Sequence, residues 1–257
     1  MVECNSVRGT ARLADVSPVT VLRHLELAGA ACLKFHDDNV RQVPSKRIEC
    51  DEIWSFNYCK RKNLDRAKSA PSDAGDVWTW TAIDPDHKLV VSFLAGNRDV
   101  ETAITFMTDV SSRLTHKVQL TTDGLNSYLP AVDEAFGTDI DFAQIEKIYG
   151  TKENDKRHQF IGSEKRSVVG KPKAEWTSTG SVEKHNQTMR QHMRRFARKT
   201  AAHSKKFENH VHMLSLYTVW YNYARINSAI RISPAMSAGL ENKLWDIGDI
   251  VDLINAG

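Results

Sequence analysis

The stretch Ile48–Tyr58 has the sequence IECDEIWSFNY, in which apolar and polar residues alternate and strand-favouring residues are frequent. This pattern predicts a strand whose apolar side chains are buried. One acid, Asp51, lies inside this strand, where a carboxylate is costly to bury unless a partner such as a metal cation compensates it. The next residue, Glu52, is expected on the opposite face of the sheet, because strand side chains alternate.

The rest of the chain adds further strands and helices to this one. Strands are predicted at Val77–Ile83, Lys88–Leu94, Val118–Thr121 and Phe142–Tyr149, and helices at Val100–Leu114 and Asn126–Phe136. Residues 150–180 are polar and rich in Lys, Gly and Ser, which predicts a long surface insertion. A long helix is predicted from Ser181 to about Arg225. This order predicts an α/β fold, with a central sheet and helices packed against it.

The first 30 residues predict a small helix-turn-helix segment. Helices are expected at Ser6–Ala14 and Val19–Leu27, and Ser17 followed by Pro18 is a strong start signal for the second one. Polar residues that face outward from the second helix are candidates for contacts with DNA bases. They are Thr20, Arg23 and His24. Beyond this segment we expect a linker at 31–47, the main domain at 48–240 and a C-terminal tail at 241–257.

Composition narrows the class of protein. Hydrophobic residues make up 41% and charged residues 26% of the 257 residues, which excludes a disordered or collagen-like chain. No apolar run reaches the ~20 residues of a membrane-spanning helix, and residues 1–10 lack a signal peptide, so we expect a cytoplasmic protein with no membrane partner. Four scattered cysteines without a C-x-x-C pair argue against a disulfide framework or a cysteine-built zinc site.

The net charge of +3 hides an asymmetry along the chain. Residues 156–210 contain 14 Lys/Arg and 4 Asp/Glu, whereas the remaining residues contain 21 Lys/Arg and 28 Asp/Glu. A basic block beside an acidic body predicts a polyanionic partner. The alternative is a solvated helix face that binds nothing.

Two further acids accompany Asp51. Asp123 follows the predicted strand Val118–Thr121, and Gly124 allows the backbone to turn directly after it. Glu183 lies near the start of the predicted long helix. Two strand acids and one helix acid can converge on a pair of Mg²⁺ ions, because hard divalent cations prefer carboxylate oxygens. Two such ions ~3.5–4 Å apart suit the displacement of a phosphodiester.

Two other acids are alternative metal ligands. Glu52 is expected on the wrong face of its strand, and Asp84 lies in the predicted hairpin turn Asp84–His87, where aspartate is favoured for backbone reasons. For these reasons we rank Glu52 and Asp84 below the three acids described above. Asp123 also has a simpler explanation than metal binding, because an aspartate at the end of a strand commonly forms a turn.

The predicted helix after Glu183 adds a second feature. At 100° per residue, several polar and basic residues fall within ~60° of Glu183. They are Gln187, Arg190, Arg194 and Arg198, with Lys199 adjoining. A separate apolar stripe of Val182, Met189, Met193 and Phe196 can pack on the sheet. The face that carries Glu183 and the basic residues suits DNA phosphates that enter a metal site. The alternative interpretation is that this face is only the solvated side of an ordinary amphipathic helix.

Six motifs occur in a characteristic order along nearly the whole chain. They are Cys50–Ser55, Gly75–Asp84, Thr121–Gly124, Val182–Arg190, Tyr221–Arg225 and Ser233–Met236. With them the chain resembles bacterial DDE transposases of the "insertion sequence one" family. The resemblance implies an RNase H-like mixed sheet with flanking helices, preceded by a DNA-binding segment that recognises terminal inverted repeats.

The resemblance also implies a chemistry. It carries a catalytic triad onto Asp51, Asp123 and Glu183, which would bind two Mg²⁺ or Mn²⁺ ions. The implied reaction is cleavage and strand transfer of an insertion sequence in double-stranded DNA, at the element ends and the target, by a homo-oligomer. The chain has no Walker motif and no G-x-S-x-G elbow, so no nucleotide cofactor is expected.

The N-terminus departs from the family pattern. Relatives usually carry a zinc-finger-like segment and another helix before the helix-turn-helix, and this sequence begins inside that region. We therefore expect a truncated copy or the downstream part of a longer reading frame. Two other functions stay open: a structure-selective RNase H-like nuclease that cuts without joining, and a truncated DNA-binding regulator without activity.

Overall fold

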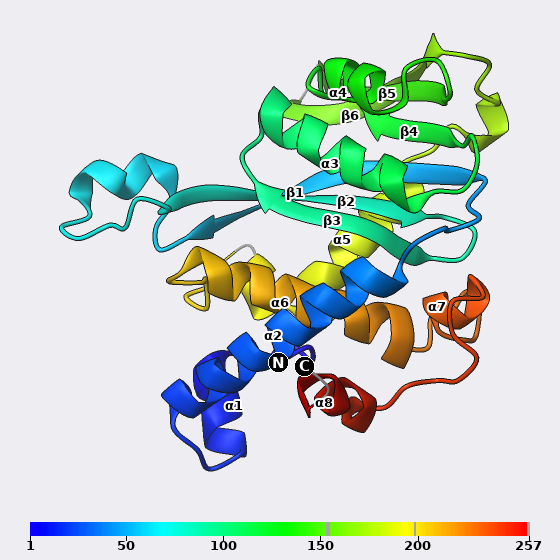
Figure 1. Cartoon of the computed structure of the whole chain (residues 1–257). Coiled ribbons are helices and arrows are strands. Elements are labelled where there is room, and N and C mark those ends of the chain that lie inside the picture. Colours follow the sequence, from blue (N-terminus) through cyan, green and yellow to red (C-terminus); the bar gives the residue numbers. More distant parts are fainter. Residues whose placement is uncertain (153–154, 198, 256–257) are drawn as a thin grey trace.

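The centre of the fold is a six-stranded mixed sheet. The computed structural model describes residues 1–152, 155–197 and 199–255, and its strands lie in the order β3-β2-β1-β4-β5-β6 (Figure 1). They are β1 Arg47–Asn57, β2 Gly75–Asp84, β3 Leu89–Gly96, β4 Gln119–Asp123, β5 Asp141–Lys152 and β6 Asp155–Val169. Strands β1, β4 and β5 run parallel, whereas β2, β3 and β6 are antiparallel to their neighbours. The predicted α/β fold, an RNase H-like mixed sheet with flanking helices, is confirmed.

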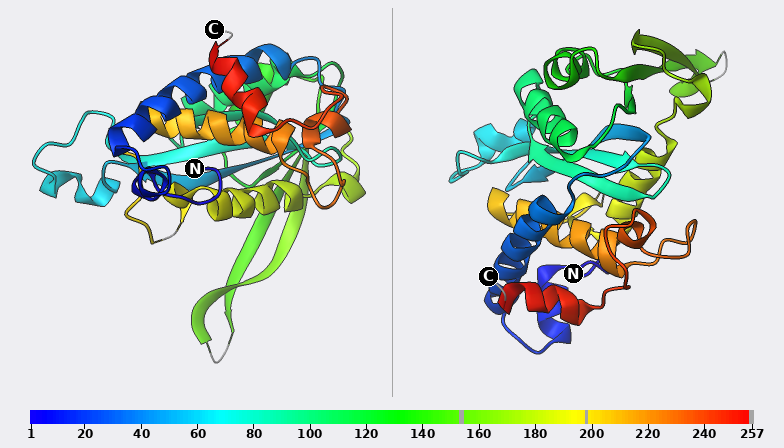
Figure 2. Two further views of the ribbon diagram at one scale, coloured as in Figure 1. Left: turned by 90° about the horizontal axis from the view of Figure 1, so that it is seen from below. Right: turned by 45° about the vertical axis from the view of Figure 1, so that its right-hand side comes forward.

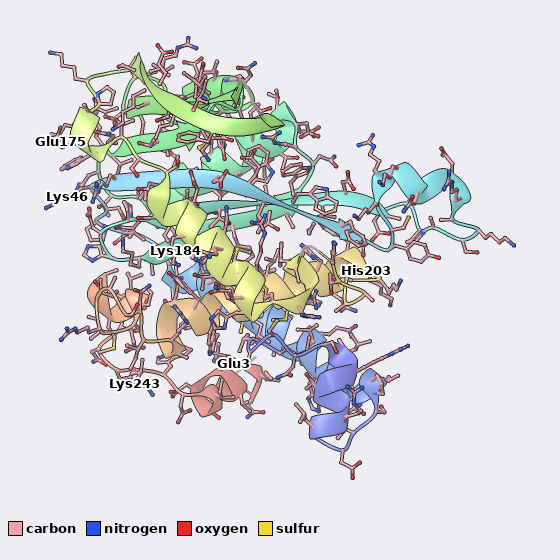
Figure 3. The ribbon with its side chains drawn as sticks, turned by 180° about the vertical axis from the view of Figure 1, so that it is seen from behind. Glu3, Lys46, Glu175, Lys184, His203 and Lys243 are labelled. Atoms are coloured by element: carbon pink, nitrogen blue, oxygen red, sulfur yellow. The ribbon has the colours of Figure 1, made fainter. Side chains whose placement is uncertain are left out.

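Helices cover both faces of the sheet. The α-helices are α1 Val7–Leu13, α2 Pro18–Asn39, α3 Val100–Arg113, α4 Tyr128–Phe136, α5 Gly180–His192, α6 Phe207–Val219, α7 Pro234–Ser237 and α8 Ile247–Asn255. In Figure 1, α3 and α4 lie on one face and α5 and α6 on the other, with α2 crossing α6. Figure 3 shows α5, on which Lys184 is labelled, lying across the back of the sheet. None of the described helices is long and apolar enough to cross a membrane.

Apolar side chains fix the helices on each face. On the α3 and α4 side, the ring of Trp80 packs against Phe106 and Tyr128, and all three side chains are fully buried. On the other side, Met189 of α5 and Tyr217 of α6 are buried. Burial of a large apolar side chain contributes roughly 1.5–3 kcal/mol, so this packing holds α5 firmly against the sheet.

Local signals in the sequence start two of these helices. The hydroxyl of Ser17 accepts the backbone N–H of Thr20 at 3.0 Å, and Pro18 is the first helical residue, as predicted. The carboxylate of Asp99 accepts the backbone N–H of Thr102 at 2.9 Å and begins α3 in the same way.

Helix α2 is longer than predicted. It continues past Leu27 to Asn39, because Cys32 and His36 remain buried, and the ring of His36 lies 3.4 Å from the backbone carbonyl of Val90 on β3. The expected linker at 31–47 is therefore helical over its first half. The expected C-terminal tail likewise contains α8, whose residue Ile250 is buried beside α2.

The predicted surface insertion at 150–180 contains a strand instead. Strand β6 pairs with β5 in an antiparallel hairpin, in which Gln144 lies opposite Arg166. The far end of this hairpin projects from the body of the protein (Figure 2), and Phe160 and Ile161 are exposed on it. Polar residues predominate because much of the hairpin faces water, so the usual apolar signal of a strand is weak.

The long helix predicted from Ser181 to Arg225 is broken. Helix α5 ends at His192, and a short 3₁₀ helix, Arg194–Phe196, precedes α6. The backbone is extended at Met193, and the buried guanidinium of Arg195 donates to the hydroxyl of Ser204 and the carbonyl of Asn209, both at 2.6 Å. Residues 190–206 contain no Gly or Pro that would mark this break in the sequence, and the buried contacts of Arg195 accompany it.

The remaining short helices lie in connections. They are the 3₁₀ helices Arg61–Arg66 and Ala174–Trp176 and the π-helix Trp220–Ala224. The predicted burial of Val182, Met189, Met193 and Phe196 is confirmed. Met193 and Phe196 lie beyond the end of α5, however, so the four residues do not form a stripe of one helix.

Candidate active site

Three carboxylates meet beside the end of β4. One oxygen from each of Asp51, Glu52 and Asp123 lies within 4.8 Å of the other two. The parallel register of β1 and β4 causes this, because Cys50 lies opposite Thr122 and the acids that follow them lie at the same level. The structure thus brings together two of the three predicted catalytic acids.

Glu52 joins the cluster from the other face of β1. Asp51 faces α5, where Asn186 Nδ2 donates to it at 2.9 Å, whereas Glu52 faces α4, where the hydroxyl of Tyr128 donates to it at 3.2 Å. The expected alternation is therefore present. Because β4 ends at Asp123, however, the longer side chain of Glu52 reaches past the strand end toward the other acids. Glu52, which we ranked as an alternative ligand below the three predicted acids, thus lies in the cluster although it faces the other side of the sheet.

Asp84 serves the hairpin turn. It is fully buried, and its carboxylate accepts the hydroxyl of Ser45 at 2.5 Å and the backbone N–H groups of Asp86 and His87 at 2.7 and 3.0 Å. These partners are the ones that an aspartate in a turn uses. The predicted turn role of Asp84 is confirmed.

A guanidinium compensates part of the negative charge. Arg98, which follows β3, forms an ion pair with Glu52 at 2.5 Å and lies 3.9 Å from Asp123. The same guanidinium lies over the ring of Trp78, 4.7 Å from its centroid. The Glu52 side chain is only 1% exposed, and a carboxylate this buried requires such a partner. Asp51, in contrast, receives its side-chain hydrogen bond from the uncharged amide of Asn186.

Burial, together with the proximity of the other carboxylates, raises the pKa values of the clustered acids. Burial, followed by the charge of Asp123, raises the pKa of Asp51 to about 6. Burial and the charges of Asp123 and Asp51 raise the pKa of Glu52 to about 7, and burial also raises the pKa of Asp123. A bound cation would stabilise the ionised carboxylates and reverse these shifts.

Glu183 lies near the cluster but is directed to other partners. Its carboxylate accepts the hydroxyl of Thr179 at 2.7 Å and pairs with Nζ of Lys147 at 2.8 Å. Burial by itself raises the pKa of Glu183, but these two partners outweigh it and hold the pKa below its usual value. The charge of Glu183 contributes to the raised pKa of Asp123, so the two groups interact. Glu183 is not among the acids that approach within 4.8 Å.

The donor atoms fit a hard divalent cation. Asp51, Asp123, Glu52 and Glu183 offer carboxylate oxygens, which Mg²⁺ and Mn²⁺ prefer. The side-chain oxygen of Asn186 is buried and has no hydrogen-bond partner among the described residues. An unpartnered amide oxygen beside Asp51 is a further hard ligand, and a cation would satisfy it.

Two polar residues that fix α5 on β1 were missed by the sequence analysis. Asn186 follows Glu183 by three residues, a spacing that places both on one side of a helix and could have revealed it. Glu49 precedes Asp51 by two residues and so shares its face of β1. The buried carboxylate of Glu49 accepts the backbone N–H groups of Ser181 and Val182 at 2.7 and 3.1 Å, in the first turn of α5.

Lys147 and Arg98 were also missed. Both are cations brought to the acids by strand pairing and loop geometry: Lys147 lies on β5, and Arg98 lies in the connection between β3 and α3. Neither has a sequence spacing that links it to Asp51 or Asp123. No local signal could have found them.

The predicted DNA-contacting residues lie in two places. On α2, Arg23 and His24 are exposed, whereas Thr20 is half-buried and shares a hydrogen bond with the hydroxyl of Ser17 at 2.9 Å. Thr20 and His24 also line an apolar hollow formed with α8.

The second group follows Glu183. Gln187 is exposed on α5, Arg190 lies in its last turn, and Arg194 and Lys199 are exposed beyond the helix end. The predicted single helical face does not extend to Arg194, because α5 ends at His192. Arg198 lies outside the described residues.

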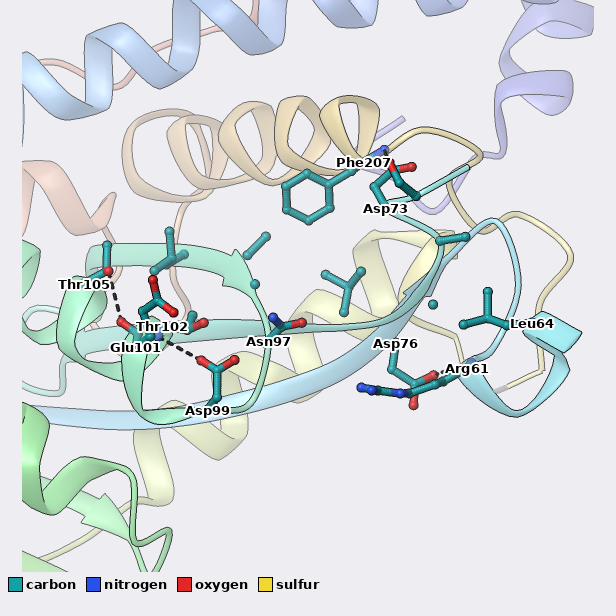
Figure 4. A pocket seen from close by; sticks show the side chains of 17 residues that line it. Arg61, Leu64, Asp73, Asp76, Asn97, Asp99, Glu101, Thr102, Thr105 and Phe207 are labelled. Atoms are coloured by element: carbon teal, nitrogen blue, oxygen red, sulfur yellow. Dashed lines mark hydrogen bonds between the residues drawn. The ribbon is translucent and has the colours of Figure 1, made fainter. Parts of the chain in front are cut away.

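A polar hollow of about 680 Å³ is lined by none of the clustered acids (Figure 4). The end of β3, the start of α3 and the connection between β1 and β2 form its walls. Asp73, Asp76, Asp99 and Glu101 line it together with one guanidinium, that of Arg61. Such a lining is unfavourable for an anionic ligand.

Comparisons with known proteins give distant likenesses. No model of a protein family matches the sequence, and no curated protein matches it. Among solved structures, the chain is similar to the Mos1 transposase paired-end complex with the left transposon end, at 14% identity and a TM-score of 0.27. It is also similar to the Mos1 strand transfer complex, at 15% and 0.27, and to a piggyBac transposase synaptic complex with hairpin DNA, at 9% and 0.35.

These matches are partial. They cover 54%, 54% and 82% of this chain, respectively, and 54%, 53% and 52% of the other chains. The matched region thus spans about half the length of each transposase. At such identities and TM-scores the likeness does not define a function, which depends on the side chains of the site.

Proposed function

We propose that this protein is a DDE transposase of a bacterial insertion sequence. It cleaves DNA at the ends of the element and joins the freed 3′-hydroxyls to target DNA. The observation that carries the proposal is the meeting of Asp51 and Asp123 at the end of β4, on the face across which α5 brings Glu183. Acids on two adjacent strands and one helix, with basic residues beyond them, suit phosphodiester chemistry on DNA.

Asp51, Asp123 and Glu183 would hold two Mg²⁺ or Mn²⁺ ions. Bound divalent ions activate the attacking oxygen and stabilise the leaving oxygen of a phosphodiester displacement. The chain itself orients the ligands: Asn186 fixes one oxygen of Asp51, and Arg98 holds Glu52. Glu52 is thereby a buried neighbour that adds negative charge close to the ions.

Basic and polar side chains would guide the DNA to these acids. Gln187, Arg190, Arg194, Arg198 and Lys199 are proposed to contact phosphates, because they follow Glu183 along the chain. Thr20, Arg23 and His24 are proposed to contact bases of the terminal inverted repeats. Two element ends have to be cut and joined together, so we propose a homo-oligomer as the active form.

Alanine substitutions test the proposal. Asp51→Ala, Asp123→Ala and Glu183→Ala should each abolish strand transfer in an assay supplied with Mg²⁺ or Mn²⁺, because each removes a ligand. Binding of the same DNA in a gel shift should be largely unchanged. Glu175→Ala is the matched control, because Glu175 is an exposed acid in a separate 3₁₀ helix. Strand transfer by the Asp123→Ala protein would refute the proposal.

The substrate separates a transposase from a nuclease. DNA supplied with pre-cut element ends and free 3′-hydroxyls should be joined to target DNA by the wild-type protein. A nuclease on the same fold would cut intact ends but leave pre-cut ends unjoined. A DNA-binding regulator would shift both substrates on a gel and alter neither.

A further inference from the structure

Lys147 lies on the same face of the sheet as Asp123. Ile145 of β5 lies opposite Asp123 of β4, and Lys147 follows it by two residues, so the strand alternation keeps it on this face. It extends beyond the end of β4 toward α5, where its Nζ lies 2.8 Å from Glu183 Oε1. The Lys147 side chain is 33% exposed and the Glu183 side chain 42%.

Its charge acts on all three acids of the proposed triad. Lys147 contributes to lowering the pKa of Asp51, Asp123 and Glu183 against the effect of burial. The ammonium, which contacts Glu183, therefore also provides a positive charge that acts on the two strand acids. A divalent cation held by the same acids needs that charge to move, because like charges at close range repel.

The ion pair between Lys147 and Glu183 can be exchanged at low cost. Both side chains are part-exposed, and an ion pair in contact with water is worth little on balance. Lys147 also has a flexible four-carbon stem, which lets its ammonium swing away without moving β5. The same side chain is then available to a phosphate, for which an ammonium is a good point-charge partner.

We propose that Lys147 is a positioning residue that occupies Glu183 in the metal-free protein and releases it when a divalent cation binds. The released ammonium then pairs with a phosphate of the bound DNA. This inference rests on the proposed function, because it concerns the same carboxylates. It adds a competition between one lysine of the chain and the metal.

Binding of Mn²⁺ to the full chain without DNA tests the competition. Lys147→Met removes the charge but keeps an apolar stem, and we expect it to tighten Mn²⁺ binding roughly tenfold at low salt. Lys147→Arg keeps the charge and should stay within about twofold of wild type. The control is Lys184→Met, which removes an exposed charge next to Glu183 that bonds to Gln187 instead. Titration calorimetry or Mn²⁺ electron paramagnetic resonance measures the affinities.

The phosphate contact gives a second readout. At saturating Mn²⁺, Lys147→Met should reduce strand transfer roughly tenfold or more, and Lys147→Arg should restore most of it. Lys147→Gln has a similar stem and no charge, so it should behave as Lys147→Met in both assays. Agreement between the two variants would show that the effect does not come from misfolding of one of them.

The outcomes separate this inference from the function. Mn²⁺ affinity equal to or weaker than wild type in Lys147→Met and Lys147→Gln overturns the role of Lys147, whatever the activity. Mn²⁺ binding that responds as expected, in a wild-type protein that neither cuts nor joins DNA, refutes the transposase and leaves the competition standing. A wild-type protein that binds no Mn²⁺ refutes both.

Discussion

Asn186 of α5 donates its side-chain amide to the carboxylate of Asp51 on β1 at 2.9 Å, although the two residues are 135 positions apart in the chain. The bond links the helix that carries Glu183 to the strand that carries the first acid of the proposed triad. Its donor is uncharged, so it orients Asp51 without neutralising it. The other atom of the amide, the oxygen, stays buried and unpartnered among the described residues.

Loss of this amide should weaken metal binding. Asn186→Leu removes the group that orients Asp51, and substitution of residues that orient metal ligands typically lowers affinity ~10–100-fold. We expect a loss in this range for Mn²⁺, measured by calorimetry. Gln187→Leu is the control, since the neighbouring side chain is exposed. Equal affinities for Asn186→Leu and wild type would show that Asp51 is oriented by other contacts.

Glu49 should control the docking of α5. Its buried carboxylate accepts two backbone N–H groups in the first turn of α5, and Glu49→Ala leaves them without a partner. We expect the free energy of unfolding to fall by about 2–4 kcal/mol and amide hydrogen exchange to increase at residues 181–186. Glu49→Gln keeps an acceptor oxygen and should lose less than half as much. Similar losses for both variants would mean that the charge of Glu49, rather than its hydrogen bonds, anchors the helix.

Stability of the metal-free protein should depend on Glu52 and pH. In the folded chain the pKa of Glu52 is raised to about 7, above its value of about 4 in an unfolded chain. Between these values the folded state binds more protons than the unfolded state, so stability falls as pH rises. We expect wild type to lose on the order of 2 kcal/mol relative to Glu52→Gln between pH 5 and pH 7.5, from urea unfolding.

Divalent ions should reverse this pH effect. Mg²⁺ or Mn²⁺ favours the ionised carboxylates, so the stabilisation that it gives wild type should grow from pH 5 to pH 7.5. The midpoint of thermal unfolding with and without about 10 mM Mg²⁺ measures this stabilisation, because a ligand that binds only the folded state raises the midpoint. A stabilisation that is independent of pH would mean that the ions bind away from Asp51 and Glu52.

Charge reversal after Glu183 should weaken DNA binding irrespective of sequence. Arg190→Glu with Arg194→Glu removes two proposed phosphate partners, so the slope of log affinity against log salt should decrease in magnitude by about 1 for each arginine replaced. Gel shifts or fluorescence anisotropy at several salt concentrations measure the slope. Lys243→Glu, at an exposed lysine far from α5 (Figure 3), is the control. A weakening limited to element-end DNA would mean that these arginines read bases.

The sequence alone determined the elements whose signals are local. The alternation in Ile48–Tyr58 predicts β1, and Ser17 with Pro18 predicts the start of α2, since strand burial and helix capping depend on neighbouring residues. Asp51 inside one buried strand and Asp123 at the end of another were predicted to converge, and the parallel register of β1 and β4 places them at one level. The burial of Val182 and Met189 on α5 was also readable from helical spacing.

Only the tertiary structure decided the surroundings of these acids. Strand β6 depends on its pairing with β5, and the break after His192 accompanies buried hydrogen bonds of Arg195 to Ser204 and Asn209; neither has a periodic signal in the sequence. The entry of Glu52 into the cluster depends on where the neighbouring strand ends, at Asp123. The ion pair between Lys147 of β5 and Glu183 of α5 depends on how the helix is docked over the sheet. A periodic pattern shows which face a side chain takes, whereas the charges it meets there come from other parts of the chain.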